Sequence, residues 1–208
     1  MSKFSSKSGY GLVADIGGTN ARFALVELVP QTPIEIMAVH RLACADYPSL
    51  PAAIRDFYER VSVKPSAVKE ATVAVAGPVD GDWFEMTNNP WAFSIRAVQQ
   101  ELELRHFYAI NDFTAVAWAI TRLKSGDFAA IGGGSPAVGA PIGIIGPGTG
   151  LGMGGLVPCG GSWNTLHSEG GHSNFAPTND LEIEIFKILL HKYGRVSNER
   201  ILSGPGLE

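Results

Sequence analysis

A glycine-dense stretch, Gly146-Pro-Gly-Thr-Gly-Leu-Gly152, constrains this chain more than any other feature. It follows an apolar run at 142–145 that is typical of a short buried strand. Glycines at alternate positions leave no Cβ atoms to hold a ligand away, so the peptide N–H groups can converge on an anion. The stretch therefore predicts a phosphate-binding turn, with a mobile surface loop as the alternative.

The pattern differs from the two commonest nucleotide-binding motifs. A P-loop needs a lysine after its last glycine, and no lysine occurs from Ser125 to Glu169. The segment 150–155 does satisfy Gly-x-Gly-x-x-Gly, but the residues at 156–161 cannot begin the helix that would receive a pyrophosphate. The sequence thus argues against both a P-loop and a dinucleotide-binding fold.

The composition is that of a globular protein with no electrostatic preference for nucleic acid. The 208 residues are 45% hydrophobic and 17% charged, so the chain can bury a substantial core and fits one large or two small domains. A net charge of −4 without a basic cluster predicts no nucleic-acid partner. No apolar run is long enough for a membrane span and the N-terminus lacks a signal peptide core, so we expect a cytoplasmic protein without a membrane partner. The two cysteines, Cys44 and Cys159, could pair in principle, but buried free thiols are favoured.

A second glycine turn lies near the start of the chain, at Gly17-Gly18. Apolar runs of strand-like character flank it, which predicts a β-hairpin. Asp15 leaves the first strand, and Thr19 and Asn20 enter the second. A carboxylate there can hold a hydrated magnesium ion, while turn amides and polar side chains reach phosphate oxygens. The alternative is a hairpin without a ligand.

The sequence between the two glycine turns alternates between strand and helix patterns. We expect strands at 34–42 and 70–76 and a helix that opens with the segment 47–51 and continues to about residue 61. The segment 80–91 is too polar and broken for a helix, so it either lines a sugar pocket or forms a solvent-facing hairpin. A helix at 95–104, a strand at 106–110 and a mostly buried helix at 113–120 follow. Glycine, serine and proline then replace any periodicity, which predicts a linker at 123–140.

Asn111 and Asp112 lie where the predicted strand gives way to the predicted helix. Asp112 could cap the helix, a contribution of about 1 kcal/mol. It could also act as a general base, because ligands gather where strands of open α/β sheets end and a carboxylate can take a proton from a hydroxyl. The two roles are compatible.

Glu169 and His172 belong to a polar cluster beyond the second glycine turn. Their spacing occurs in helical metal sites, but Gly170-Gly171 argues against a helix and no cysteine set accompanies them. Hydrogen bonding to vicinal hydroxyls suits a loop with a carboxylate and an imidazole better than metal ligation does, because the carboxylate accepts and the imidazole donates or accepts. A helix over 181–193, ended by Gly194, and a short helix from about 197 follow.

Taken together, these motifs resemble those of bacterial glucokinases. The matching segments run in order along the chain, at 15–22, 76–78, 86–88, 91–94, 110–115, 146–152, 169–172 and 196–207. The combination is specific, although no single motif is. The resemblance implies an α/β fold of the actin-like, hexokinase type (ribonuclease H-like), in which two lobes with mixed sheets close on a cleft. The lobes would be a small N-terminal lobe, 1–122, and an incomplete larger C-terminal lobe, 141–208.

The resemblance also implies the reaction and its residues. ATP, with Mg²⁺, would phosphorylate the 6-hydroxyl of glucose. Asp112 would take the proton from that hydroxyl, Asn111 would orient the sugar, and the other hydroxyls would be bound by Glu169, His172 and Glu199. The first phosphate motif would consist of Asp15, Ile16, Gly17, Gly18, Thr19 and Asn20, with Asp15 also holding the metal ion. The second would consist of Gly146, Gly148, Thr149 and Gly150.

Further expectations follow from the resemblance. Related repressor-kinase sugar kinases carry a cysteine-rich zinc motif that this sequence lacks, so we expect no structural zinc; a homodimer is what the family suggests. Family members continue past the segment 204–207, so the chain would be C-terminally shortened, bind glucose measurably, bind ATP weakly and turn over slowly. ATP and polyphosphate both stay open as the phosphoryl donor. Two other functions stay open too: a non-catalytic sugar-binding fragment, and a sugar-responsive regulator, which would need a helix-turn-helix that the nine residues before Tyr10 cannot hold.

Overall fold

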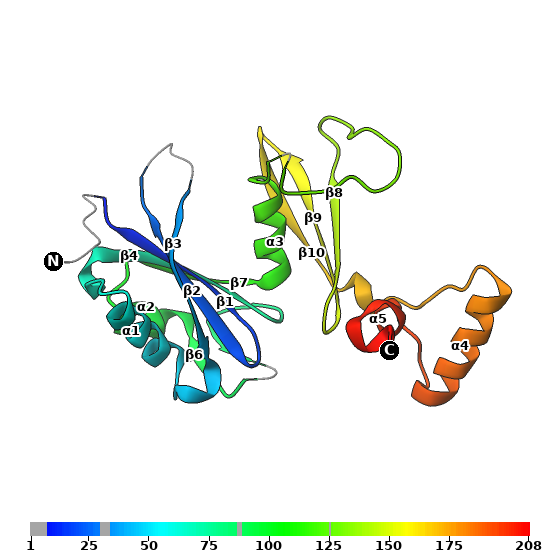
Figure 1. Cartoon of the computed structure of the whole chain (residues 1–208), viewed down its shortest axis with the longest axis horizontal. Coiled ribbons are helices and arrows are strands. Elements are labelled where there is room, and N and C mark those ends of the chain that lie inside the picture. The colour runs from blue at the N-terminus through cyan, green and yellow to red at the C-terminus, as the bar shows by residue number, and fades with distance from the viewer. Residues whose placement is uncertain (1–7, 30–33, 87–88, 125) are drawn as a thin grey trace. The chain divides into compact units, whose positions relative to one another are not determined.

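The computed structural model describes residues 8–29, 34–86, 89–124 and 126–208 (Figure 1). Residues 87 and 88 of the 86–88 motif lie outside the described residues. The chain divides into two compact units, Met1–Asp112 and Phe113–Glu208. The lobe boundaries at 122 and 141 stay a prediction. None of the described helices is long and apolar enough to cross a bilayer.

The first unit is built on a five-stranded mixed sheet in the order β3-β2-β1-β4-β7. Its strands are β1 (Tyr10–Ile16), β2 (Asn20–Glu27), β3 (Ile36–Ala43), β4 (Val68–Val75) and β7 (His106–Asn111). The pairs β1–β2 and β2–β3 are antiparallel, whereas β1–β4 and β4–β7 are parallel. The predicted hairpin at Gly17-Gly18 is confirmed.

Two helices of the first unit begin at serine caps. The hydroxyl of Ser49 accepts the N–H of Ala52 at 3.3 Å and starts α1 (Leu50–Arg60). The hydroxyl of Ser94 does the same for α2 (Ile95–Glu101). Short 3₁₀ turns lie at Cys44–Asp46 and Pro65–Ala67. The caps explain why each helix starts where its apolar periodicity starts.

The polar segment at 80–91 forms part of a short hairpin. Its strands are β5 (Trp83–Glu85) and β6 (Ala92–Ser94), which pair antiparallel. Trp91 between them is only 1% exposed, and its indole N–H donates to the carbonyl oxygen of Tyr47 at 3.0 Å. The segment therefore contributes to a hairpin, but the hairpin is not solvent-facing, because Phe84, Met86 and Trp91 are buried. The Trp91 ring packs in the core, where it cannot stack on a sugar.

The second unit contains a smaller, antiparallel sheet in the order β10-β9-β8. Its strands are β8 (Ile142–Pro147), β9 (Leu151–Cys159) and β10 (Ser162–Ser168). Helix α3 (Asp112–Ile120) packs on it through Ala117, which clusters with Ile144 and Leu156. Between α3 and β8 the described residues form neither helix nor strand.

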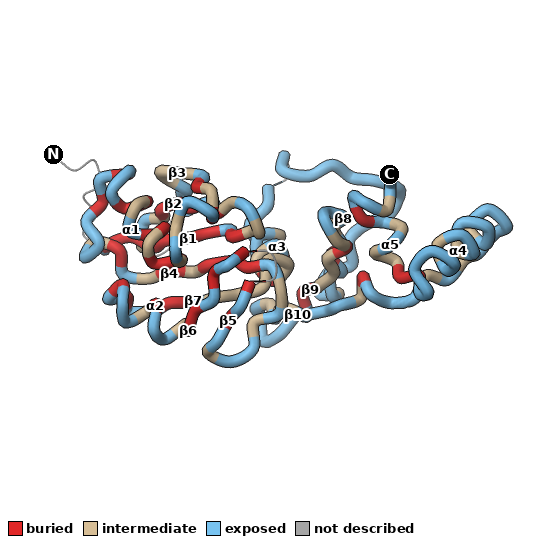
Figure 2. Tube along the Cα trace, turned by 90° about the horizontal axis from the view of Figure 1, so that it is seen from below, coloured by how far each residue is buried: buried red, intermediate tan, exposed pale blue. Residues whose placement is uncertain are grey.

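The remaining elements of the second unit are short or exposed. They are a 3₁₀ turn at Gly170–His172, α4 (Asp180–Tyr193), α5 (Asn198–Leu202) and a 3₁₀ turn at Gly204–Gly206. Helix α4 ends at Gly194 in the left-handed conformation, with φ of 72°, as the sequence predicts. No residue of α4 is buried, whereas buried residues are frequent in the strands of the first unit (Figure 2).

The prediction that the helix after Asp112 is mostly buried is wrong. Only Thr114 and Ala117 of α3 are buried, whereas Val116 and Trp118 are 44% and 43% exposed. The small sheet of the second unit covers one side of the helix, so the apolar residues on the other side stay exposed.

Candidate functional site

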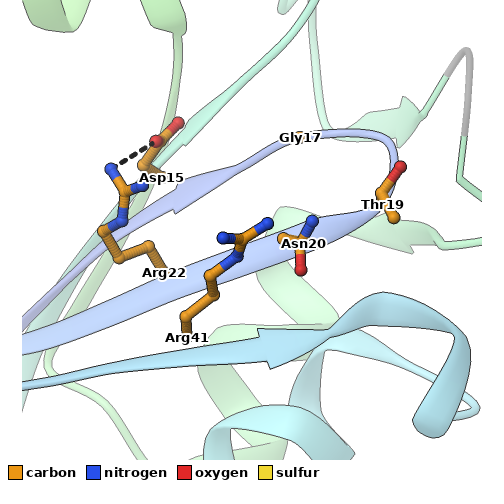
Figure 3. A pocket seen from close by; sticks show the side chains of 6 residues that line it. All are labelled: Asp15, Gly17, Thr19, Asn20, Arg22 and Arg41. Atoms are coloured by element: carbon orange, nitrogen blue, oxygen red, sulfur yellow. Dashed lines mark ion pairs between the residues drawn. The ribbon is translucent and has the colours of Figure 1, made fainter.

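The turn between β1 and β2 borders a cavity of about 340 Å³ (Figure 3). Four predicted phosphate-motif residues line it: Asp15, Gly17, Thr19 and Asn20. The turn is closed by the Gly17 N–H, which donates to the carbonyl oxygen of Asn20 at 2.9 Å. Ile16, also predicted as part of the motif, is 1% exposed and packs in the core, so it does not line the cavity. Backbone and polar side chains thus converge on one cavity, as an anion site requires.

Two arginines of this cavity, Arg22 and Arg41, are absent from the residues predicted from the sequence. Asp15 pairs with Arg22 across β1 and β2, and Arg22 pairs with Arg41 across β2 and β3. The three side chains therefore project from the same face of the sheet (Figure 3). Arg22 Nη1 lies 3.7 Å from Asp15 Oδ2, an exposed ion pair. Like charges directly opposite on neighbouring strands repel, and a bound anion would relieve that repulsion.

A metal ion at Asp15 would need ligands beyond the protein. Among the described residues, no group of three or more His, Cys, Asp or Glu side chains could hold a metal. Mg²⁺ in phosphoryl-transfer sites keeps several waters and is held through one or two carboxylates and the substrate phosphates. The exposed carboxylate of Asp15, beside a cavity suited to phosphate, fits that manner of binding.

The glycine-dense stretch at 146–152 forms the end of the β8–β9 hairpin. Gly146 pairs with Gly152, and the Gly148 N–H donates to the carbonyl oxygen of Gly150 at 2.8 Å in the turn. A Cβ atom on Gly146 would lie 2.7 Å from the ring of Phe113, and one on Gly150 would lie 2.5 Å from Glu199 Oε2. Only at Gly148, among the glycines of the turn itself, would a Cβ atom meet nothing within 4 Å. Internal packing thus requires glycine at several of these positions, in addition to any ligand.

The turn at 148–150 is held by hydrogen bonds to residues near the C-terminus of the chain, Glu199 and Gly204. The Gly204 N–H donates to the carbonyl oxygen of Gly148 at 2.7 Å. The Leu151 N–H donates to Glu199 Oε2 at 2.9 Å. The hairpin is therefore held by α5 and the turn that follows α5.

Three predicted sugar-binding side chains come together in the second unit: Glu169 and His172 of the loop 169–173, called the sugar loop below, and Glu199 of α5. His172 Nδ1 lies 3.5 Å from Glu199 Oε1, and His172 Nε2 lies 3.7 Å from Glu169 Oε2. The side chain of Glu169 is 74% exposed, that of His172 57% and that of Glu199 30%. An imidazole between two carboxylates offers both donors and acceptors, at a solvent-accessible position, as a polyol requires.

Asn111 and Asp112 belong to the other unit. Asn111 ends β7, and its side-chain amide donates to the carbonyl oxygen of Gly77 at 3.1 Å. Asp112 is the first residue of α3, where the helix dipole favours a negative charge. The five predicted sugar residues therefore fall into two groups, two residues in the first unit and three in the second.

Helix α3 is joined to the small sheet by a polar contact as well. The hydroxyl of Thr114 and Nδ1 of His167, on β10, lie 2.9 Å apart. His167 thereby helps to hold α3 against the small sheet of the second unit.

The two cysteines are free, as the sequence favours, but only one is buried. The Cys44 thiol contacts the carbonyl oxygen of Gly17 at 3.6 Å, and burial raises its pKa. Cys159 is exposed, so the prediction of burial is wrong for this residue. Its position at the end of β9, beside the Gly160-Gly161 turn, explains the exposure.

The mixed α/β architecture with two glycine hairpins is a fold of the hexokinase type, which solved structures of sugar kinases share. Structures of the same fold include a glucokinase from an Antarctic psychrotroph, at a TM-score of 0.84 and 37% identity over 96% of this chain and 62% of that one. Another is a glucokinase of the ROK family from Streptomyces griseus, in complex with glucose and AMPPNP, at a TM-score of 0.56 and 22% identity over 96% of this chain and 59% of that one.

The glucokinase family model matches residues 12–208, and the chain belongs to the glucokinase family. The glucokinase of Neisseria meningitidis serogroup C is 48% identical over 98% of this chain and 60% of its own length. That of Marinobacter nauticus is 47% identical over 95% of this chain and 60% of its own length. The chain thus spans about 60% of the length of these relatives.

Proposed function

We propose that this protein is an ATP-dependent glucokinase, which transfers the γ-phosphoryl group of ATP to the 6-hydroxyl of glucose. The observation that carries the proposal is the cluster of Glu169, His172 and Glu199 in a chain of the glucokinase family. Glucose presents several hydroxyls at fixed relative positions, and each can donate one hydrogen bond and accept others. Carboxylates that accept and an imidazole that also donates match those hydroxyls.

We assign the chemical step to Asp112. The Asp112 carboxylate, at the N-terminus of α3, can accept the proton as the 6-hydroxyl attacks the phosphorus. Asn111, one residue earlier, would orient the sugar through its side-chain amide. The same amide group donates to Gly77, which fixes its direction at the end of β7.

The two glycine hairpins would hold the phosphates. The cavity at Asp15, Thr19 and Asn20 supplies polar side chains and turn amides, and Arg22 and Arg41 add positive charge. The turn at Gly148–Gly150 supplies a second set of peptide groups. Mg²⁺ near Asp15 would neutralise charge on the transferred group; in phosphoryl transfer the protein contributes mainly positioning and electrostatics. We also propose a cytoplasmic protein that can form a homodimer, as the family suggests.

A coupled assay for glucose 6-phosphate tests the proposal. We expect product only when glucose, ATP and Mg²⁺ are all present, and much less product from Asp112→Asn. Glucose binding without any glucose 6-phosphate would instead identify a non-catalytic sugar-binding protein.

A further inference from the structure

The two carboxylate oxygens of Glu199 contact different parts of the second unit. Oε2 accepts the N–H of Leu151, directly after the glycine turn, at 2.9 Å. Oε1 lies 3.5 Å from Nδ1 of His172, in the sugar loop. A carboxylate is planar and rigid, so a change in the direction of one oxygen moves the other. One side chain therefore connects the predicted sugar loop with the predicted phosphate hairpin.

The approach of Glu199 to the hairpin depends on a glycine. A Cβ atom on Gly150 would lie 2.5 Å from Oε2 of Glu199, closer than such atoms approach, and 3.3 Å from Cδ, which is a tight contact. A Cβ atom on Gly148, two residues earlier in the same turn, would meet nothing within 4 Å. The carboxylate can thus keep this position only if residue 150 is glycine, whereas an added methyl group at residue 148 would not touch it.

The backbone around Glu199 supports the same connection. The Asn198 N–H donates to the carbonyl oxygen of Ser173 at 3.0 Å, and the Asn198 side-chain amide donates to the Ser173 hydroxyl at 2.8 Å. The Gly204 N–H donates to Gly148 on the hairpin side. The segment 198–204 is therefore bonded to the sugar loop at one end and to the glycine turn at the other.

We propose that Glu199 is a positioning residue that couples the sugar loop to the phosphate hairpin. When glucose engages His172 and the Glu199 carboxylate, the direction of Oε2 is fixed and the hydrogen bond from Leu151 is strengthened, which orders the hairpin for the donor phosphates. The inference rests on the proposed function, because it takes glucose as the ligand of the loop. Coupling between two binding sites is reciprocal, so ordering of the hairpin also favours glucose binding.

NMR of the ¹⁵N-labelled 208-residue chain during a glucose titration tests the coupling. His172 reports binding at the loop, and the Leu151 amide reports the hairpin. We expect both to respond in the unsubstituted chain and in Gly148→Ala. In Gly150→Ala we expect His172 to respond and the Leu151 amide to stay unchanged, because the added methyl group displaces Oε2.

Two results would overturn the inference. A His172 response without a Leu151 response in the unsubstituted chain would show that glucose binds but that the coupling is absent. An equal Leu151 response in Gly150→Ala and Gly148→Ala would show that the response does not pass through Glu199. If neither reporter responds, glucose does not bind the loop, which contradicts the proposed function and the coupling together.

A second pair of variants keeps the test decisive if Gly150→Ala does not fold. Glu199→Gln keeps the shape of the side chain but replaces a charge-assisted hydrogen bond with a neutral one, so amide exchange at Leu151 should be roughly 10-fold faster. Glu182→Gln is the matched control, because Glu182 also accepts a backbone N–H, from Thr178, away from the hairpin and the sugar loop. Equal Leu151 exchange in Glu199→Gln and Glu182→Gln would overturn the positioning role.

Discussion

The ring of Phe113 occupies the space that a Cβ atom on Gly152 would need. The same ring lies against Gly146, the partner of Gly152 across β8 and β9. Phe113 follows Asp112 directly in α3, so the residue next to the proposed base is packed on the hairpin that bears the second glycine motif. The absence of side chains at these two glycines is therefore a requirement of packing.

This packing predicts a compensating pair of substitutions. Gly152→Ala should lower the free energy of unfolding by about 1–3 kcal/mol, because overpacking forces the ring or the strand to move. In a Phe113→Leu background the same substitution should be less destabilising, since leucine leaves more room. Gly143→Ala, on β8 with nothing within 4 Å of its added Cβ, is the control and should be nearly neutral. Denaturant unfolding of Gly152→Ala, Phe113→Leu, the double variant and Gly143→Ala, each compared with the unsubstituted chain, measures these effects. If Gly152→Ala were equally destabilising with Phe113 and with Leu at residue 113, the contact between Phe113 and Gly152 would be contradicted.

Replacement of the proposed base separates chemistry from binding. Asp112→Asn should lower kcat by about 10²-fold or more, because the amide cannot accept the proton, while glucose affinity changes little. Steady-state kinetics together with glucose binding measures both effects. A variant with near-normal kcat would reduce Asp112 to a structural residue at the start of α3.

Loss of the hydroxyl should affect stability differently at two tyrosines, Tyr58 within α1 and Tyr47 just before it. The described residues offer the buried hydroxyl of Tyr58 no hydrogen-bond partner, and burial raises the pKa of that hydroxyl. Tyr58→Phe should therefore leave stability unchanged or raise it by up to about 1 kcal/mol. Tyr47 donates to the carboxylate of Asp56, so Tyr47→Phe should lower stability by about 1 kcal/mol. Thermal unfolding of both variants would refute this account if Tyr58→Phe proved the more destabilising.

Asp56 should contribute to the acid sensitivity of the first unit. The hydroxyl of Tyr47 and then the guanidinium of Arg60 hold the pKa of Asp56 below its usual value. A lowered folded-state pKa gives stability that is present above the unfolded pKa of about 4 and is lost as the pH falls through the folded value. Asp56→Asn should thus be less stable than the unsubstituted chain at neutral pH, and the difference should shrink below about pH 4. A difference that is constant from pH 7 to pH 3 would exclude this contribution.

The local features of the fold follow from the sequence because their causes are local. The hairpin at Gly17-Gly18 needs only two strands and a glycine turn, and α4 ends at Gly194 because glycine adopts the left-handed conformation there. The buried position of Trp91 does not follow, because its partner, the carbonyl oxygen of Tyr47, is distant in sequence.

The candidate site likewise has features that the sequence predicts and features that it does not predict. The resemblance names Glu169, His172 and Glu199, but neither spacing nor composition shows that Glu199 also holds Leu151. The cavity at the first hairpin includes Arg41 because of the register between β2 and β3, a long-range pairing that the sequence does not specify.

The most direct test of the central claim is the affinity of the 208-residue chain for glucose, measured by isothermal titration calorimetry. We expect saturable binding at one site, weakened about 10-fold or more by Glu169→Gln and by His172→Ala, each of which removes a hydrogen-bonding group from the proposed pocket. Glu182 is a carboxylate outside the loop, so the Glu182→Gln variant should bind glucose with the same affinity as the unsubstituted chain. No detectable heat of glucose binding, or the same affinity in all four proteins, would contradict the assignment of this cluster as the sugar site.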